Sequence, residues 1–435
     1  MSQSAAQPDA LPAPSIAATP AAPGWRSVPR WRVVAHVAAL VLCWSTVQAT
    51  DLLMPVIARK TFGATGWQVL LITAAPMVLM VLSIFWADRL KRMGLTKYLV
   101  VYWAIAMLPM VLLAFAQGYW WVGLVYLASC CGKAAWPVVN GEILKLIYPD
   151  SVRGRVYGGV TTASLAVSGL MSWGLGEWLH ADEQAFRIFF PILAGLQLAG
   201  VLIFAGIAER AGASRSRVLA DPHEGHVLKR VFGPLSHTRE VLKSDRVFAR
   251  YEAAFMTYGI GWMVFYALLP LIGTDGLKLT YEQVGAAAYM PFQISRAACT
   301  FLGGWAMDRY GAMRTCMASF ALYTLVPLLL AGATGVQAMT VACVVWGVAA
   351  AGVDAGWMLG PVNLAPSKDK VPQYVAIHAT MVGVRGSLFQ FAGMALYLAT
   401  GSFTWPLLIA AASFVWASRQ MYTLRQMVPR EPERQ

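Results

Sequence analysis

The chain has 435 residues, of which 58% are hydrophobic and only 13% carry a charged side chain. Soluble proteins carry about 25% charged residues, so this composition excludes a soluble globular protein and predicts an all-α polytopic membrane protein. The net charge of +13 fits basic loops that face anionic lipid, and it does not require a nucleic acid as partner.

Residues 1–30 are predicted to form a disordered cytoplasmic tail. The first 24 contain no Lys or Arg, which excludes a secretory signal peptide because such a peptide begins with a basic stretch. Twelve apolar runs follow, and each reaches or approaches the ~20 residues that a helix needs to cross the hydrocarbon core. They cover roughly residues 33–57, 67–86, 98–116, 120–146, 156–179, 187–207, 251–273, 283–306, 313–332, 336–362, 373–398 and 402–421.

The runs fall into two sets of six. We therefore expect a six-helix bundle over 31–207, a basic cytoplasmic loop over 208–250, a second six-helix bundle over 251–421 and a cytoplasmic tail over 422–435. With both termini on one side, 27 of the 34 Lys and Arg residues lie on that side and four on the other. Because basic loops stay in the cytoplasm, this count predicts a bacterial inner (plasma) membrane protein with cytoplasmic termini.

The two halves resemble each other. "WQVLLITAAP" at 67–76 matches "EQVGAAAYMP" at 282–291, an offset of about 215 residues. "KAAWP" and "DAGWM" make Lys133 and Asp354 equivalent positions of the repeat, and likewise Trp136 and Trp357, at a similar offset. Repeats of this kind build many transporters, and the binding site then lies between the halves near the middle of the membrane.

Each half carries a charged stretch after its second helix, "WADRLKRMG" at 86–94 and "GWAMDRYGAMR" at 304–314. Twelve helices, two similar halves and these Asp-Arg pairs resemble the major facilitator superfamily over nearly the whole chain. The family pattern is G-x-x-x-D-R-x-G-R-R. The first copy has Ile84 and Lys91 in place of its glycines, and the second has Ala312 and Met313 in place of its basic pair.

This resemblance implies a gate that holds the cytoplasmic side closed and breaks as the transporter rocks. The alternative is a basic loop that only sets the topology. The implied gate residues are Asp88, Arg89 and Arg92 in the first copy, and Gly304, Asp308, Arg309 and Gly311 in the weaker second copy.

A charged side chain at the centre of the bilayer costs about 3 kcal/mol, so each one in a span needs an explanation. Lys133 and Asp354 are predicted to meet across the cavity as a pair that substrate or a proton can break; the alternative is a salt bridge that only fixes packing. Asp51 is the candidate proton site, with a backbone-bonded Asp as the equal alternative. We interpret His378 as a packed, hydrogen-bonded histidine and place Glu252 at the cytoplasmic mouth of its helix.

Two arginines within the spans of the second half, Arg296 and Arg385, suit an anionic substrate. A guanidinium grips carboxylate or phosphate at two points. The alternative is that each arginine pairs with Asp354 or with a backbone carbonyl. Trp136 and Trp357 fall on helices predicted to line the cavity, where each could stack on a substrate, although packing is the better interpretation of either one.

These features predict a secondary active transporter that moves a small organic anion or zwitterion by alternating access, with the proton as coupling ion. The expected partners are the substrate, the proton and membrane lipid. We expect a monomer without cofactor, metal or nucleic acid. The sequence contains no P-loop, H-E-x-x-H or G-x-S-x-G motif, so an enzyme is not expected. The alternatives are a receptor or scaffold with a transporter fold, and a facilitative uniporter.

Overall fold

The computed structural model describes residues 28–83, 85–86, 90, 93–148, 150–212, 238–367 and 370–427. Over these residues the protein is helical and contains no strand, as predicted. The predicted N-terminal tail up to residue 27, the central loop over 213–237 and the last residues from 428 lie outside the described residues.

The first half ends with α8. Its described helices make six consecutive membrane-length segments, of which the second, third and fourth are each divided in two. The helices are α1 (Arg30–Lys60), α2 (Gly66–Leu79) with η2 (Met80–Leu82), α4 (Leu95–Ala106) with η3 (Leu108–Phe115), α5 (Tyr119–Lys133) with α6 (Trp136–Ile147), α7 (Asp150–Ala181) and α8 (Phe186–Arg210).

The second half begins with α10, and its described helices again make six segments. They are α10 (Arg246–Leu271) with η4 (Ile272–Gly276), α11 (Tyr281–Gln283) with η5 (Val284–Tyr289) and the first part of α12 (Met290–Tyr323), the rest of α12 with α13 (Leu325–Ala331), α14 (Val336–Leu364), α15 (Val371–Thr400) and α16 (Thr404–Met427). Both η4 and η5 are π-helical, a geometry that is rare and often found at functional sites. Since α10 begins at Arg246 and α16 reaches Met427, both extend beyond the predicted bundle of 251–421.

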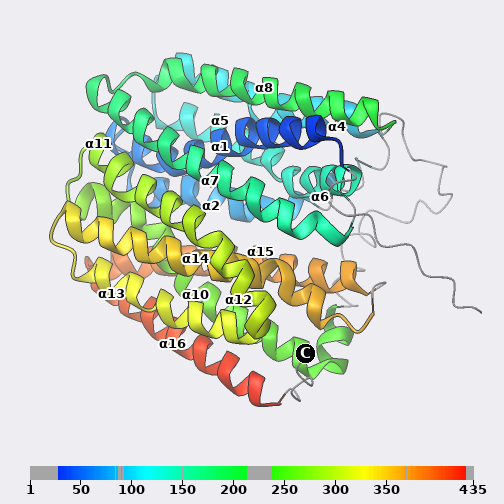
Figure 1. The fold of residues 1–435 in the computed structure, drawn as a ribbon. Helices are drawn as coiled ribbons and strands as arrows, with labels where there is room; N and C mark the ends of the chain where they lie inside the picture. Colours follow the sequence, from blue (N-terminus) through cyan, green and yellow to red (C-terminus); the bar gives the residue numbers. More distant parts are fainter. Residues whose placement is uncertain are drawn as a thin grey trace, which may run out of the picture.

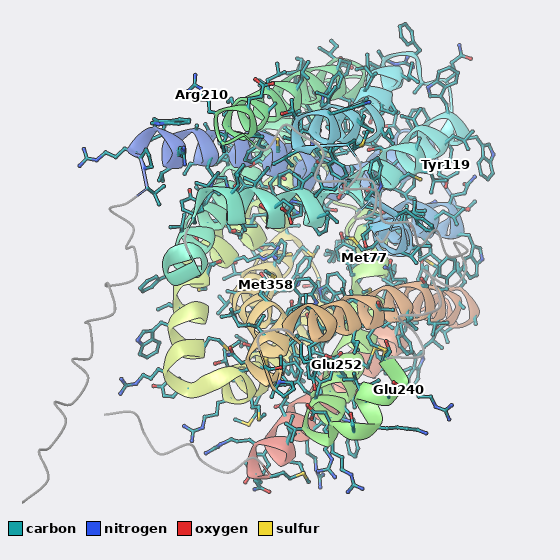
Figure 2. All side chains as sticks on the ribbon, turned by 90° about the vertical axis from the view of Figure 1, so that its right-hand side faces the viewer. Met77, Tyr119, Arg210, Glu240, Glu252 and Met358 are labelled. Carbon is teal, nitrogen blue, oxygen red and sulfur yellow. The ribbon has the colours of Figure 1, made fainter. Side chains whose placement is uncertain are left out.

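The two halves lie side by side, with the first half uppermost in Figure 1 and the second half below it. The helices run roughly parallel to one another, so the molecule has two ends. We call the right-hand end, where α1 begins and α16 finishes, the terminal end, and the other the opposite end. Figure 2 views the molecule from the terminal end.

The predicted repeat is visible in the helix boundaries. Thr65 and Thr280 each cap a helix through a reciprocal capping box, with Gln68 and Gln283 three residues further on. In each half the second and third segments are separated by a glycine of positive φ, Gly94 in the first half and Gly311 within α12. These positions recur at offsets of 215 and 217 residues, so equivalent local signals begin and end equivalent helices.

The halves touch through α7 against α12 and through α2 against α15. Just before α12, α7 also packs on α11 and η5, where a side chain on Gly176 would overlap the backbone oxygen of Tyr281, and one on Gly285 would overlap that of Ser172. Glycine is required at both positions for this close approach. Seven described helical segments are long and apolar enough to span a membrane. The segments of α2, α7, α15, α16 and the first part of α12 fall outside these seven; all of them except α16, which packs on α10, α12 and α13, take part in the contacts that form the seam between the halves. The chain is thus a multi-pass integral membrane protein.

Candidate functional site

Within the described part of the first half, the most buried ion pair joins Asp51 of α1 to Lys133 of α5. Lys133 Nζ lies 2.5 Å from Asp51 Oδ1, and the two side chains are 7% and 18% exposed. The Tyr126 hydroxyl donates to the same oxygen at 2.8 Å, and its ring lies 4.6 Å from Nζ. Asp51 is therefore a paired, hydrogen-bonded carboxylate.

Local sequence explains the position of Lys133. Pro137 cannot donate a backbone hydrogen bond, and the fourth segment breaks just before it, at Ala134 and Ala135. Lys133 becomes the last residue of α5. A cation is favoured at the carboxyl end of a helix, and the adjoining α1 supplies the carboxylate.

The second half carries its own ion pair between Arg296 of α12 and Asp354 of α14. Arg296 Nε and Nη2 both lie 2.7 Å from Asp354 Oδ2, with side chains 23% and 44% exposed. The predicted contact between Lys133 and Asp354 is therefore wrong in this structure. Their positions are equivalent in the repeat, but each side chain finds its partner within its own half.

Arg385 of α15 is buried and does not pair with Asp354. Its Nη1 donates to the backbone oxygen of Phe255 at 2.5 Å, and its guanidinium lies 5.7 Å from the Tyr258 ring. Gly259 makes room for it, because a side chain there would overlap the arginine. Among the described residues no carboxylate lies within ion-pair distance of Arg385.

The two candidate tryptophans differ. Trp136 is buried and stacks on Trp44 at 5.8 Å between ring centroids, with Tyr102 and Phe204 on other sides. These contacts favour the packing interpretation for Trp136. Trp357 is partly exposed and lies 5.6 Å from the His378 ring.

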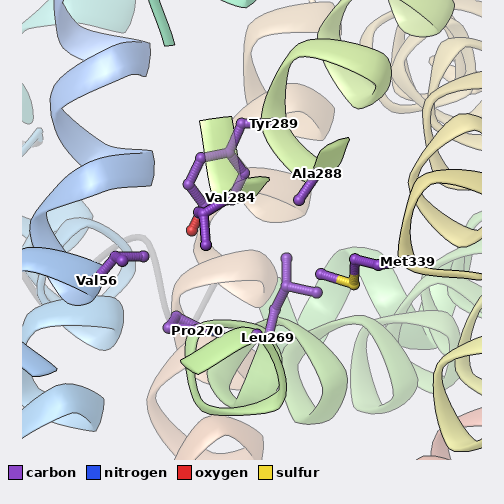
Figure 3. Close-up of a pocket in the computed structure, with 8 residues that line it drawn as sticks. Val56, Leu269, Pro270, Val284, Ala288, Tyr289 and Met339 are labelled. Atoms are coloured by element: carbon purple, nitrogen blue, oxygen red, sulfur yellow. The ribbon is translucent and has the colours of Figure 1, made fainter. Parts of the chain in front are cut away.

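Asp51 also reaches the seam. It lines a cavity of about 10 Å³, enough for about one water molecule, between α1 and α2 on one side and α10 and η5 on the other. An apolar cavity of similar size adjoins it, and Figure 3 shows Val56 of α1 facing Leu269, Pro270 and Tyr289 of the second half. Gln293 extends the polar contact across the seam, with its Nε2 3.2 Å from Gln48 and 3.1 Å from Ser168.

Ionic and polar contacts join the two halves at the opposite end. Arg59 at the end of α1 makes a two-point bond to Asp275 of η4, with Nε–Oδ1 at 2.8 Å and Nη2–Oδ2 at 2.6 Å. Further contacts are Lys60 Nζ to the Leu279 oxygen at 2.6 Å, the Thr61 and Tyr281 hydroxyls at 2.5 Å, and His180 Nε2 to Glu282 at 3.7 Å. Sequence reasoning missed this cluster, although Arg59 and Lys60 are two of the four cations on that side.

The predicted gate is described in part. Asp88, Arg89 and Arg92 lie outside the described residues, and so does the side chain of Asp308. Arg309 lies 6.0 and 5.9 Å from the Trp305 and Tyr310 rings. Gly304 is helical, and Gly311 turns the chain at φ 78°.

The sequence and the fold were compared with known proteins. The crystal structure of a mutant of the nucleoside transporter NupG matches with a TM-score of 0.69 and 13% identity, covering 90% of this chain and 99% of that one. A bacterial homolog of the human lysosomal transporter Spinster, in an inward-facing and unoccupied conformation, matches with a TM-score of 0.59 and 15% identity, covering 91% and 98%. No curated protein sequence matches the chain. The sequence profile of the Major Facilitator Superfamily matches residues 37–389. With this match over most of its length, the chain belongs to the major facilitator superfamily of membrane transporters.

Proposed function

We propose that the protein is a secondary active transporter that moves a small organic anion, or a zwitterion with a carboxylate, by proton-coupled alternating access. The observation that carries the proposal is the buried Asp51–Lys133 pair at the seam between the halves. A substrate carboxylate entering the seam competes with Asp51 for Lys133. In the proposal a proton then neutralises the released Asp51 carboxylate, which no longer has a cation beside it.

The orientation follows from the charge count, with both termini and the basic central loop in the cytoplasm. The opposite end is then the outer end, and the Arg59–Asp275 cluster closes it in this structure. Outward opening must break these contacts, while the predicted gate at Asp88 and Arg89 closes the cytoplasmic end in the other state. Arg296 and Arg385 place two guanidinium groups in the second half, and a guanidinium suits a carboxylate substrate.

The test is uptake into proteoliposomes from a panel of radiolabelled carboxylates, amino acids and nucleosides, with and without a protonophore. Nucleosides belong in the panel because a nucleoside transporter shares the fold. We expect an inward-acid pH gradient to drive accumulation of a carboxylate and the protonophore to abolish it. Downhill flux at the same rate with and without the protonophore supports a uniporter. Binding without flux for every compound supports a receptor or scaffold.

A further inference from the structure

A second buried acid–base pair lies in the second half of the molecule. His378 Nδ1 of α15 lies 2.8 and 3.0 Å from the two carboxylate oxygens of Glu252 of α10, and the side chains are 3% and 2% exposed. Figure 2 shows Glu252 in the lower half, where α10 approaches α15. Sequence reasoning treated these residues separately, as a packed histidine and a carboxylate at a helix mouth.

The contact fixes the proton position on neutral His378 beside the ionised carboxylate of Glu252. Because Glu252 accepts at Nδ1, neutral His378 carries its proton there and leaves a lone pair on Nε2. Within the described part of the chain, His378 Nε2 is buried and has no hydrogen-bond partner. Taking up a proton would convert this atom into a second donor, with Glu252 already placed to stabilise the imidazolium.

Arg385 lies two turns further along α15, on the same face as His378. Phe255 of α10 joins them, since its backbone oxygen accepts from Arg385 and its ring meets the His378 ring edge-on at 4.9 Å. Arg385 Nε is buried and, like His378 Nε2, has no hydrogen-bond partner among the residues that the structure describes. Two buried nitrogens of this kind thus lie on either side of Phe255, a donor on Arg385 and, on neutral His378, an acceptor that protonation turns into a donor.

The net charge of Glu252, His378 and Arg385 depends on whether His378 is protonated. Glu252 and Arg385 balance when His378 is neutral, and protonation of His378 leaves one positive charge in excess. At low dielectric this excess attracts an anion. A proton on His378 must then raise the affinity for the anion by the same factor by which the bound anion raises the affinity for the proton.

The neighbouring ionisable groups have other partners. On α10 the Tyr251 hydroxyl donates to the Gly356 oxygen at 2.9 Å and lies 3.9 Å from Cys316 Sγ of α12. On α14, Asp354 pairs with Arg296. One turn before His378, the Tyr374 hydroxyl donates to Asp245 at 2.8 Å.

We propose that Glu252, His378 and Arg385 form a proton-linked binding site for a small carboxylate anion. Arg385 supplies the fixed positive charge, His378 the positive charge that depends on the proton, and Glu252 the counter-ion that holds the imidazole in place. The proposal rests on the proposed function, and it adds a proton position distinct from Asp51.

The test is the titration of His378 in purified full-length protein labelled with ¹⁵N-histidine and placed in lipid nanodiscs. The His378 resonance is assigned by its loss in His378→Gln. The pH midpoint of its titration is measured in chloride, acetate and benzoate at equal ionic strength. We expect both carboxylates to raise the midpoint above its value in chloride. Measured directly, benzoate affinity should increase by roughly tenfold on protonation, a usual size for coupled sites.

Variants sharpen this measurement. Arg385→Gln should abolish the carboxylate-dependent shift, whereas the exposed control Arg419→Gln should keep it. Glu252→Gln should lower the midpoint in chloride, because the imidazolium loses its counter-ion. Equal midpoints in chloride, acetate and benzoate for the wild type would overturn the proposal without any variant. A shift that persists in a folded Arg385→Gln protein would also overturn it.

This measurement is independent of transport. A protein that shows the shift but moves no solute would reject the proposed transport and keep the site. Proton-driven uptake without any shift at His378 would reject the site and leave the proton on Asp51.

Discussion

The two halves of this transporter carry buried charges at equivalent positions but use them differently. In the first half Lys133 forms an ion pair with Asp51, and Tyr126 donates a hydrogen bond to the same carboxylate. In the second half Asp354 pairs with Arg296, while buried Arg385 donates to a backbone oxygen and has no ion-pair partner within the described residues. Under the proposed function the halves have different roles: the first half provides an ion pair that a substrate can exchange, and the second half provides the guanidinium of Arg385 for an anion.

The largest expected effect is the loss of stability when the Asp51–Lys133 pair of the first half is broken. Lys133→Ala leaves Asp51 without its cation, and removing one partner of a buried pair costs roughly 3–5 kcal/mol. Thermal unfolding in detergent should show this loss. The double variant Lys133→Ala, Asp51→Ala should be less destabilised than the sum of the single variants.

The matched control for this cycle is Lys133→Ala with Asp354→Ala. Because the two residues do not touch, their losses should add. Additive losses for Lys133 and Asp51, together with strong coupling between Lys133 and Asp354, would restore the pairing expected from the sequence.

The second prediction concerns Arg385, the buried arginine of the second half. Arg385→Gln should weaken binding of the transported carboxylate by roughly 10- to 150-fold, since a hydrogen bond to a charged group contributes about 1.5–3 kcal/mol. Arg296→Gln should have a smaller effect, because Arg296 is more exposed and already bonded to Asp354. Equal, weak effects of both variants on binding measured by titration calorimetry would contradict the proposed division between the halves.

A smaller effect is expected where the halves meet at the opposite end. Asp275→Asn removes the two-point bond from Arg59, and a partly exposed pair contributes up to about 1 kcal/mol, so the outward-open population should rise by roughly fivefold. Spin labels near Thr65 and Gly276 would report the longer distance. An unchanged distance distribution would show that the pair does not hold this end closed.

The smallest stability effect is expected at the loop after the second helix. Asp88→Asn should leave insertion and abundance near normal while transport falls and the cytoplasmic end opens more often. Uptake by the variant, normalised to protein in the membrane, measures this. Full transport would reduce the loop to a topology signal.

The helices were predictable because membrane spans depend on local composition. Twelve apolar runs and the repeat at 67–76 and 282–291 were enough to predict where the helices lie. The capping boxes at Thr65 and Thr280 begin a helix at matching positions of the two copies. The ionisable residues of the spans could also be named from the sequence, since each is costly in a bilayer.

The alternative given for the two arginines agrees with the structure, since Arg296 pairs with Asp354 and Arg385 donates to a backbone oxygen. The other partners could not be predicted, because pairing depends on how neighbouring helices are rotated. Repeat symmetry made Lys133 and Asp354 look like partners, but equivalent positions need not touch. Lys133 meets Asp51 because α5 ends there beside α1, and His378 meets Glu252 because α15 packs on α10. The sequence placed Arg59 among the four cations of the non-cytoplasmic side without a partner, and the fold places Asp275 beside it.

The most direct test of the central claim compares accumulation with exchange in Asp51→Asn. The claim is that a proton on Asp51 replaces Lys133 when the substrate carboxylate binds, and an amide at this position mimics the protonated state. In proteoliposomes preloaded with substrate, Asp51→Asn should still exchange labelled for unlabelled substrate. The variant should fail to accumulate substrate in response to a pH gradient. Undiminished proton-driven accumulation by Asp51→Asn would contradict the claim and leave the Asp51–Lys133 pair as a structural contact.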